Sequence, residues 1–465
     1  MPPDTLRDRT AVAVADPVLK SNLRNAVDRF STARERGLGE LVDPDGLRHA
    51  ARAMRGHIIG DWAPTLERLA DKLLANGAHV CWATDADEAN AYIRDVARRI
   101  GATSVVKSKS MATEEIGLND VLAADGRKVT ETDLGEWIIQ LAGEHPSHII
   151  VPAVHRNRHQ IADTFQAEAG MVERRTEPEE LTAFARTALR ERFLEADLGI
   201  SGANLGVADT GSIVLVTNEG NGRLVTSLPK VHIAVLGAER IVQTWDQADL
   251  LLALLARSAT GQRLTTYTSV VTGPRRAGEA DGPDELHVVI LDNGRTGLAG
   301  TEFAEMLNCI RCGACLNVCP VYRQAGGHAY GWVYPGPMGA VLTPLLAAKE
   351  AEGGGPAELA GASTLCGACM EACPVEIPLQ DLLLALRRKK ATEGGARGEH
   401  AIWRAWSEAW SRPALYRAGN KAAVRMRRLA PVAAKLGLAK RWTAGRELPA
   451  LGERTFTERW ASGER

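Results

Sequence analysis

The sequence predicts an α/β domain with a layered sheet, followed by a small cysteine-rich helical domain and a basic helical tail. Short apolar stretches alternate with amphipathic helical stretches between residues 59 and 295, which is typical of α/β proteins. Seven of the eight cysteines lie between residues 309 and 373. Residues 381–442 contain fifteen lysines and arginines but only four acidic residues, although the formal net charge of the whole chain is only -1.

Taken in order, the chain divides into four predicted parts: a helical segment (1–58), the α/β domain (59–295), the cysteine-rich domain (296–390) and the basic helical region (391–465). Apolar residues at helical spacing predict helices over Leu19–Ala33, Leu47–Arg55, Trp62–Asn76 and Asp87–Ile100. Runs of β-branched and apolar residues predict strands over Ala78–Ala83, Ser104–Val106, His148–Val151, Ile213–Thr217, His232–Leu236 and His287–Ile290. Glycine and proline predict a loop over Gly273–Pro283 and a surface turn over Gly353–Pro356.

Composition places the chain among ordinary globular proteins, with 45% hydrophobic and 24% charged residues. Its 465 residues suggest roughly two to four domains. The first thirty residues carry charges throughout and contain no apolar signal-peptide core. The longest apolar run, near Leu250–Ala256, is too short to span a bilayer. We therefore expect a cytoplasmic protein, either free or peripheral at the cytoplasmic face of the membrane.

The clustered cysteines form two motifs, and each motif is followed by proline. The first has the spacing C-x2-C-x2-C-x3-C-P and consists of Cys309, Cys312, Cys315 and Cys319. The second has the spacing C-x2-C-x3-C-P and consists of Cys366, Cys369 and Cys373. The first spacing is that of bacterial two-cluster ferredoxins, whereas zinc sites usually use two separated pairs and disulfides need an oxidising compartment. The sequence therefore predicts iron–sulfur clusters, which transfer single electrons.

In a crosswise ferredoxin, three closely spaced thiolates and one distant thiolate hold each cluster. Cluster 1, a 4Fe-4S cluster, is then expected on Cys309, Cys312, Cys315 and Cys373. Cluster 2 is expected on Cys319, Cys366 and Cys369, one thiolate short, because Ser363 occupies the expected first ligand position. A serine oxygen binds iron more weakly than a thiolate does. Cluster 2 is therefore predicted to be 3Fe-4S, 4Fe-4S with a labile corner, or capped by another ligand.

The eighth cysteine, Cys81, lies in an apolar stretch and is expected to be a small core residue. The α/β domain has its own polar segment, Lys107, Ser108, Lys109 and Ser110, at the end of a predicted strand and before a predicted helix near Thr113. Two lysines and two hydroxyls in that place are typical of an anion site, and a solvated loop with a helix cap is the equal alternative.

A second polar segment leads into the strand predicted at Ile213 and is dense in glycine. We expect ligand contacts from Asp209, Thr210, Gly211 and Ser212, and from Glu219 after that strand. Asn221–Gly222 is expected to form a hairpin turn instead. No flavin, nicotinamide or nucleotide-phosphate motif is present in the sequence.

The basic tail predicts a docking surface for an acidic partner or for anionic lipid headgroups, with a solvated helical face as the equal alternative. Trp403, Trp406 and Trp410 follow one another at helical spacing and are expected to pack inside the protein. Nucleic acid is not an expected partner, because no basic segment interleaved with aromatic residues is present.

Four segments of the α/β domain, together with both cysteine motifs, resemble the lactate utilization protein B family, which is built on the domain named after lactate utilization (LUD): Lys107–Met111, Ile200–Gly206, Thr210–Ser212 and Thr217–Asn221. The resemblance covers essentially the whole chain, and the family also has three cysteines in the second motif. It implies an α/β sheet with helices on both faces, similar to the class of sugar-phosphate isomerases and CoA-transferases.

The same resemblance implies one component of a three-protein system that oxidises L-lactate to pyruvate. A cysteine-rich protein and a smaller LUD-domain protein are the implied partners. In that setting the chain is expected to be a non-catalytic electron carrier. Two alternatives stay open: a hydroxy-acid oxidoreductase that uses the α/β domain or an open cluster iron, and a scaffold or redox-sensing subunit.

Overall fold

The computed structural model describes residues 5–346, 356–394, 397–429 and 452–463, and the single positions 432, 443 and 450. The chain divides into two compact units, Met1–Arg388 and Lys389–Arg465. Within the described residues, no helix is both long enough and apolar enough to cross a membrane.

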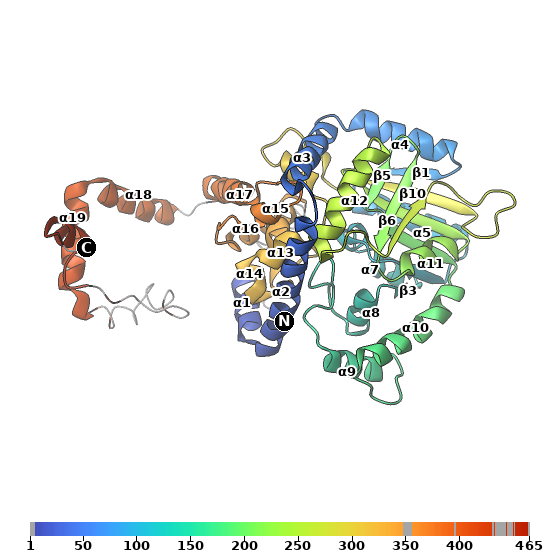
Figure 1. Ribbon diagram of the computed structural model, residues 1–465, viewed down its shortest axis with the longest axis horizontal. Coiled ribbons are helices and arrows are strands. Elements are labelled where there is room, and N and C mark those ends of the chain that lie inside the picture. Colours follow the sequence, from blue (N-terminus) through green and yellow to red (C-terminus); the bar gives the residue numbers. More distant parts are fainter. Residues whose placement is uncertain are drawn as a thin grey trace. The chain divides into compact units, whose positions relative to one another are not determined.

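The first unit contains a six-stranded sheet with the strand order β1-β10-β7-β4-β2-β3 (Figure 1). All neighbouring strands of this sheet are parallel. The strands are β1 (His79–Ala83), β2 (Ser104–Lys107), β3 (Lys128–Glu131), β4 (Leu198–Gly202), β7 (Val231–Gly237) and β10 (Glu285–Leu291). Because all six strands run the same way, their carboxyl ends lie at one edge of the sheet, where ligands of α/β proteins usually bind.

Alternate residues of the central strands enter different apolar cores, as is typical of a parallel sheet that is covered on both faces. In β7, Ile233 and Val235 belong to one core, whereas Ala234 and Leu236 belong to another. The helices of this region are α4 (Ala63–Ala75), α5 (Ala86–Arg99), α6 (Met111–Glu115), α7 (Leu118–Ala124), α8 (Leu134–Leu141), α9 (Arg158–Glu168), α10 (Pro178–Leu194), α11 (Asn221–Ser227) and α12 (Trp245–Thr260). The predicted α/β fold is confirmed.

A second, four-stranded sheet packs beside the first, with the strand order β8-β5-β6-β9. Its strands are β5 (Leu205–Val207), β6 (Ser212–Thr217), β8 (Ile241–Val242) and β9 (Tyr267–Val271). Apolar residues of β5, β6 and β8 share one core with helix α12 and with the cysteine-rich domain. That shared core joins the two domains into one unit.

Three helices precede the α/β domain: α1 (Leu6–Ala15), α2 (Pro17–Gly39) and α3 (Pro44–Gly60). Asp16 and Asp43 cap α2 and α3, and each is followed by proline at the first helical position, a pairing that favours helix initiation. Helix α2 contacts α12 of the α/β domain and also α13 and α14 of the cysteine-rich domain (Figure 1). Helix α2 therefore packs against both the α/β domain and the cysteine-rich domain.

The cysteine-rich domain is built from short helices, as the sequence predicts. They are η1 (Thr296–Leu298), η2 (Ala304–Asn308), α13 (Ala314–Val318), α14 (Pro320–Ala325), η3 (His328–Tyr330), α15 (Gly336–Leu346), η5 (Pro356–Gly361), α16 (Ala368–Ala372) and α17 (Leu379–Gly394). Of the turn predicted over Gly353–Pro356, residues 353–355 lie outside the described residues, and Pro356 begins η5.

The second unit contains α18 (Arg397–Ser411), α19 (Pro413–Arg425), η6 (Arg427–Leu429) and α22 (Phe456–Ala461). Trp403, Trp406 and Trp410 share one face of α18 and contact one another, but each is half exposed, at 58%, 50% and 53% respectively. The prediction that these tryptophans pack inside the protein is therefore wrong. The helical spacing identifies a face but does not show what covers it.

Five of the six predicted strands are present, with ends that differ by at most two residues. The sixth, His148–Val151, is wrong because the buried His148 ring accepts hydrogen bonds from the backbone N–H groups of Ile150 and Val151, at 3.0 and 3.2 Å. These N–H groups are therefore not available for the backbone hydrogen bonds to a neighbouring strand that a β-strand would need. The predicted hairpin at Asn221–Gly222 is also wrong, because these residues begin α11 after the left-handed Gly220.

Candidate metal centres and an adjoining pocket

Four cysteines line one small cavity in the cysteine-rich domain. They are Cys309, Cys312, Cys315 and Cys373, the set assigned to cluster 1 from the spacing. Arg311 also lines the cavity, and apolar side chains form most of the remaining wall, from Ile149, Met306, Ile310, Met338, Val375, Ile377 and Leu379. Four sulfurs in an apolar enclosure can hold a cubane cluster away from water.

The two cysteine motifs have the same backbone conformation. In the first, Arg311 and Gly313 have positive φ angles of 58° and 77° and lead into the five-residue helix α13. In the second, Leu365 and Gly367 have φ angles of 56° and 86° and lead into the five-residue helix α16. The motifs are therefore structural repeats. In each one, two residues with positive φ angles make the loop curve tightly before the short helix begins.

Ser363 occupies the place of the first cysteine in this repeat. The N–H group of Arg311 donates to the sulfur of Cys309 at 3.4 Å, and the N–H group of Leu365 donates to the hydroxyl of Ser363 at 3.1 Å. A serine that already accepts a backbone hydrogen bond fills the turn without supplying a thiolate.

We therefore expect that replacing Ser363 with alanine leaves the iron content of the purified protein unchanged. Replacing it with cysteine is expected to supply an eighth thiolate and to slow the loss of iron in air. Iron and acid-labile sulfide analysis measures both results. Loss of iron from the alanine variant would show that the serine hydroxyl is a ligand.

The remaining cysteines, Cys319, Cys366 and Cys369, lie close enough to one another that each charge affects the others. Cys319 accepts a hydrogen bond from the N–H group of Tyr322 at 3.5 Å. Cys366 is exposed, and a hydrogen bond from the hydroxyl of Thr364 lowers the pKa of its thiol. Cluster 2 would therefore lie at the surface of the first unit, whereas the cluster 1 cavity is enclosed.

The pKa values of the thiols around the cluster 1 cavity indicate whether an iron–sulfur cluster fits there. Burial raises the pKa of Cys312 to about 12 and the pKa of Cys373 to about 11, because a bare thiolate is unfavourable without water. A cationic metal group would compensate the thiolates, and its binding would release their protons. The sulfur donors, the apolar enclosure and the N–H···S hydrogen bonds therefore fit an iron–sulfur cluster.

Arginines from other parts of the chain donate to the backbone of the cysteine loops. Arg240, which follows β7, donates to the carbonyl oxygens of Cys309 and Ile310 at 2.8 and 3.2 Å. Arg34 of α2 donates to the carbonyl of Ala372 at 2.9 Å, and Arg48 of α3 donates to that of Cys373 at 3.0 Å. Side chains from outside the cysteine-rich domain thus hold the backbone of both cysteine motifs in place.

A larger pocket of about 390 Å³ lies at the carboxyl ends of the parallel strands. Residues after β2, β3, β4, β7 and β10 line it, among them Ser108, Lys109, Ser110, Asp133, Asn204, Glu239, Arg240 and Arg295. Arg311 and Tyr334 of the cysteine-rich domain line it as well. The pocket therefore lies between the two domains of the first unit, in the place where α/β folds bind ligands.

Only part of the predicted anion-binding segment, residues 107–110, lies at the pocket. Ser108, Lys109 and Ser110 line the pocket, but Lys107 does not. The side chain of Lys107 is 1% exposed, and its Nζ pairs with Glu114 and Glu131 at 2.8 Å each and donates to Thr113 at 2.9 Å. Lys107 is the last residue of β2 and points into the core. Its charge is already matched, so it is not available to a ligand.

The second predicted ligand-binding segment, residues 209–212, does not line this pocket. Asp209 pairs with Arg68 of α4 at 2.7 Å, and the carbonyl of Thr210 accepts from the amide of Asn76 at 2.9 Å. Gly211 approaches the backbone of α4, and Ser212 begins β6. These four residues support packing of α4 onto the second sheet. Glu219 does line the pocket, where it accepts a hydrogen bond from the N–H group of Leu134 at 2.9 Å.

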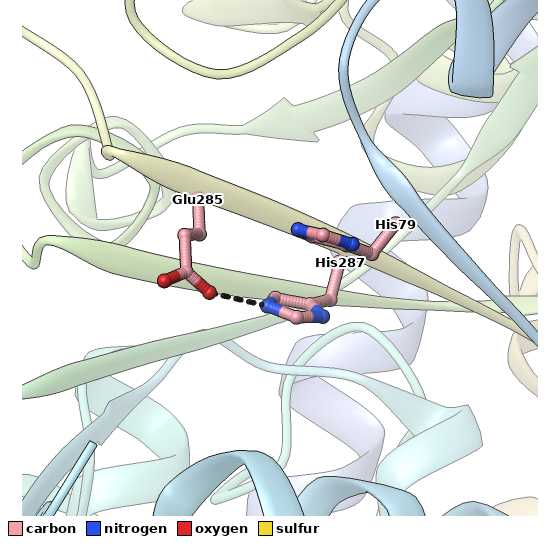
Figure 2. A group of neighbouring side chains, drawn as sticks. All are labelled: His79, Glu285 and His287. Atoms are coloured by element: carbon pink, nitrogen blue, oxygen red, sulfur yellow. Dashed lines mark hydrogen bonds and ion pairs between the residues drawn. The ribbon is translucent and has the colours of Figure 1, made fainter. Parts of the chain in front are cut away.

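A third group, His79, Glu285 and His287, lies on the neighbouring strands β1 and β10 (Figure 2). These residue types can hold a metal ion. However, the two rings stack with their centroids 4.6 Å apart and their planes 20° apart, so their lone pairs do not converge on one point. His287 also contacts the hydroxyl of Tyr92 at 2.8 Å, and Glu285 pairs with Arg99. The group is a hydrogen-bonded stack.

Comparison with known families matches three successive segments of the chain. The LUD domain matches residues 66–291, the 4Fe-4S dicluster domain matches residues 305–377, and the family described as "Lactate utilisation protein B, C-terminal" matches residues 387–464. The iron–sulfur character predicted from the cysteine motifs is thereby confirmed.

Relatives of known name match over nearly the full length. The Lactate utilization protein B of Bacillus licheniformis is 46% identical, over 97% of this chain and 95% of the relative. That of Bacillus subtilis is 44% identical, over 99% and 97%. The "Uncharacterized electron transport protein YkgF" of Escherichia coli is 44% identical, over 97% and 95%. The chain therefore belongs to the lactate utilization protein B family.

Proposed function

We propose that this protein is the electron-transfer iron–sulfur component of a system that oxidises L-lactate to pyruvate. The observation that carries the proposal is the meeting of four cysteines from two motifs around one enclosed cavity, as two-cluster ferredoxins require. The names of the relatives, which refer to lactate utilization and to electron transport, support the same function.

In this proposal Cys309, Cys312, Cys315 and Cys373 hold a 4Fe-4S cluster, and Cys319, Cys366 and Cys369 hold a 4Fe-4S or 3Fe-4S cluster. When bound, such clusters accept and release one electron at a time. The apolar wall of the first cavity excludes water, and backbone N–H groups donate to the sulfurs of three cysteines: Cys309, Cys319 and Cys373. Hydrogen bonds to sulfur and exclusion of water both set the reduction potential.

The exposed Cys366 marks the face that a redox partner can approach. We expect two partners, a cysteine-rich protein and a smaller LUD-domain protein, in the cytoplasm. The basic residues of the tail offer a docking surface to an acidic partner or to the membrane face.

The proposal predicts that lactate reduces the protein only when its partners are present. Protein purified without oxygen is expected to contain roughly seven to eight iron atoms per chain. Electron paramagnetic resonance after addition of lactate is then expected to show reduced clusters in the reconstituted mixture and not in the isolated protein. Iron-free protein that was fully competent in lactate oxidation would refute the proposal.

A second candidate is supported by Ser363, which leaves cluster 2 without a fourth thiolate from the described residues of the motif. An iron with an open position can act as a Lewis acid toward a hydroxy acid. The protein would then be an oxidoreductase in its own right. Lactate-dependent reduction of an artificial acceptor by the isolated, cluster-replete protein would favour this candidate, and dependence on the partners would favour the first.

A further inference from the structure

In the pocket at the strand ends, one nitrogen atom of each of two cationic side chains has no hydrogen-bond partner among the described residues. The Nζ atom of Lys109 and the Nη1 atom of Arg311 are buried, and neither makes a hydrogen bond with any described residue. Both residues line the pocket. Burying an unpaired charge is costly, so buried cations are normally matched by an acceptor. The Nζ atom of Lys109 and the Nη1 atom of Arg311 are therefore both available to an anionic ligand in the pocket.

The other cations around the pocket are fully engaged. Arg295 pairs with Glu115 at 2.8 Å and with Glu239 at 2.6 Å. Arg240 donates both of its terminal nitrogens to carbonyls of the first cysteine motif. The Nη2 atom of Arg311 itself reaches Glu239 at 3.2 Å, which leaves only its second nitrogen unused. The spare positive charge is thus confined to Lys109 and to one side of Arg311.

No acidic residue forms an ion pair with Lys109 within the described residues. Glu136 and Glu219 act on Lys109 only at longer range, and no ion pair joins either of them to it within the described residues. Burial raises the pKa of Glu136 and the pKa of Glu219, which disfavours the carboxylate form of both side chains. Asp133 also lines the pocket, but its carboxylate caps helix α8 by accepting from the N–H group of Glu136.

The pocket has the size and the polar groups of a small-molecule site. Its volume of about 390 Å³ falls in the usual range for organic ligands, which is roughly 300–1,000 Å³. Hydroxyl and amide side chains also line the pocket, from Ser108, Ser110, Asn204 and Asn221. Such groups suit an organic anion that carries further hydroxyl or carbonyl oxygens.

The pocket also adjoins the cavity of cluster 1. Arg311 lies between the ligands Cys309 and Cys312 in the sequence, and its side chain stacks over Tyr334 at 4.8 Å. Arg311 and Ile149 line both the pocket and the four-cysteine cavity. A ligand on Arg311 would therefore lie one side chain away from the metal centre.

We propose that this pocket binds an organic anion, a carboxylate or a phosphate ester, whose charge is matched by Lys109 and Arg311 beside cluster 1. The site deepens the proposed function, on which its link to the cluster rests. Reduction adds negative charge to the cluster, so the anion binds the oxidised protein more tightly and lowers the reduction potential of cluster 1. By linkage, a tenfold difference in affinity between the two states lowers that potential by about 59 mV.

The test uses cluster-replete protein with pyruvate as the carboxylate probe and inorganic phosphate as the phosphate probe. Isothermal titration calorimetry is expected to show binding of one of them with a dissociation constant of about 1 mM or below. Lys109→Gln is expected to weaken that binding at least about tenfold, because a charge-assisted hydrogen bond is lost. Its melting temperature is expected to stay equal or to rise, because the lysine has no partner to lose.

Lys230→Gln serves as the matched control, because Lys230 is an exposed lysine outside the pocket. It is expected to bind the probe as the wild type does. Failure of both probes to bind the wild-type protein would overturn the proposal, and so would unchanged binding by the Lys109 variant. Iron content and spectra recorded on the same samples separate the two claims: absent clusters with intact binding refute the proposed function, whereas intact clusters without binding refute only the anion site.

Discussion

Replacing Cys312 with serine is expected to abolish cluster 1 and with it the transfer of electrons from lactate. Cys312 is only 8% exposed and is one of the four cysteines around the enclosed cavity. Serine offers a harder and weaker ligand to iron, and no spare thiol lines that cavity among the described residues. We expect the loss of about half of the iron and of one of the two spectroscopic signals.

Cys81→Ser provides the matched control for this experiment. Cys81 lies half-buried in β1, packed against the core under α5, and outside the cysteine-rich domain. The control is expected to keep the full iron content and both signals. Full iron content in the Cys312 variant would contradict its assignment as a cluster ligand, and iron loss in the Cys81 variant would show that iron binding also depends on a cysteine outside the two motifs.

Replacing Lys107 with methionine is expected to cost about 3–5 kcal/mol in the free energy of unfolding. The substitution keeps the apolar stem but leaves the buried carboxylate of Glu131 and the partly buried carboxylate of Glu114 without their cation. The carboxylates of Glu114 and Glu131 raise the pKa of Lys107 above its ordinary value, against the opposing effect of burial. A raised lysine pKa stabilises the folded state fully below the ordinary value of 10.5, so the whole contribution is present at neutral pH.

Urea or guanidinium unfolding at neutral pH measures this loss. The variant is expected to recover part of it as the pH falls, because protonation removes the uncompensated charge of Glu131, whose pKa burial already raises. Lys109→Gln, two residues further along, is the control and is expected to lose no stability. Equal stability of the Lys107 variant and the wild type would show that the ion pairs contribute nothing.

The contrast between Lys107 and Lys109 shows how far the sequence could predict this site. The lysine- and serine-rich segment after a strand correctly indicated the polar edge of the sheet. It did not indicate that Lys107 is still part of β2 and points into the core, because a strand end can shift by one residue without any visible signal. The partner carboxylate on β3 was also hidden, since that strand was not predicted.

The cysteine motifs were readable because their spacing is local, and the family comparison confirms their iron–sulfur character. Arg240, Arg295 and Tyr334 could not be found this way, because they reach the pocket from distant segments. Arg311 carried one usable signal, its place between the first two cysteines of the first motif. The likeness of the α/β domain to sugar-phosphate isomerases and CoA-transferases stays a prediction, and so does the docking role of the basic tail.

The hydrogen bonds from Arg34 and Arg48 to the loop around Cys373 have a consequence for how the protein matures. The two partners in each bond are separated by 338 and 325 residues of chain. The ribosome synthesises α2 and α3 first and Cys373 much later. Until then, the four-cysteine cavity is incomplete in the nascent chain. The four-cysteine cavity is therefore complete only after translation has passed residue 373. A truncated product that ends before Cys373 would lack one of the four cysteines of that cavity, even if it contained Cys309, Cys312 and Cys315.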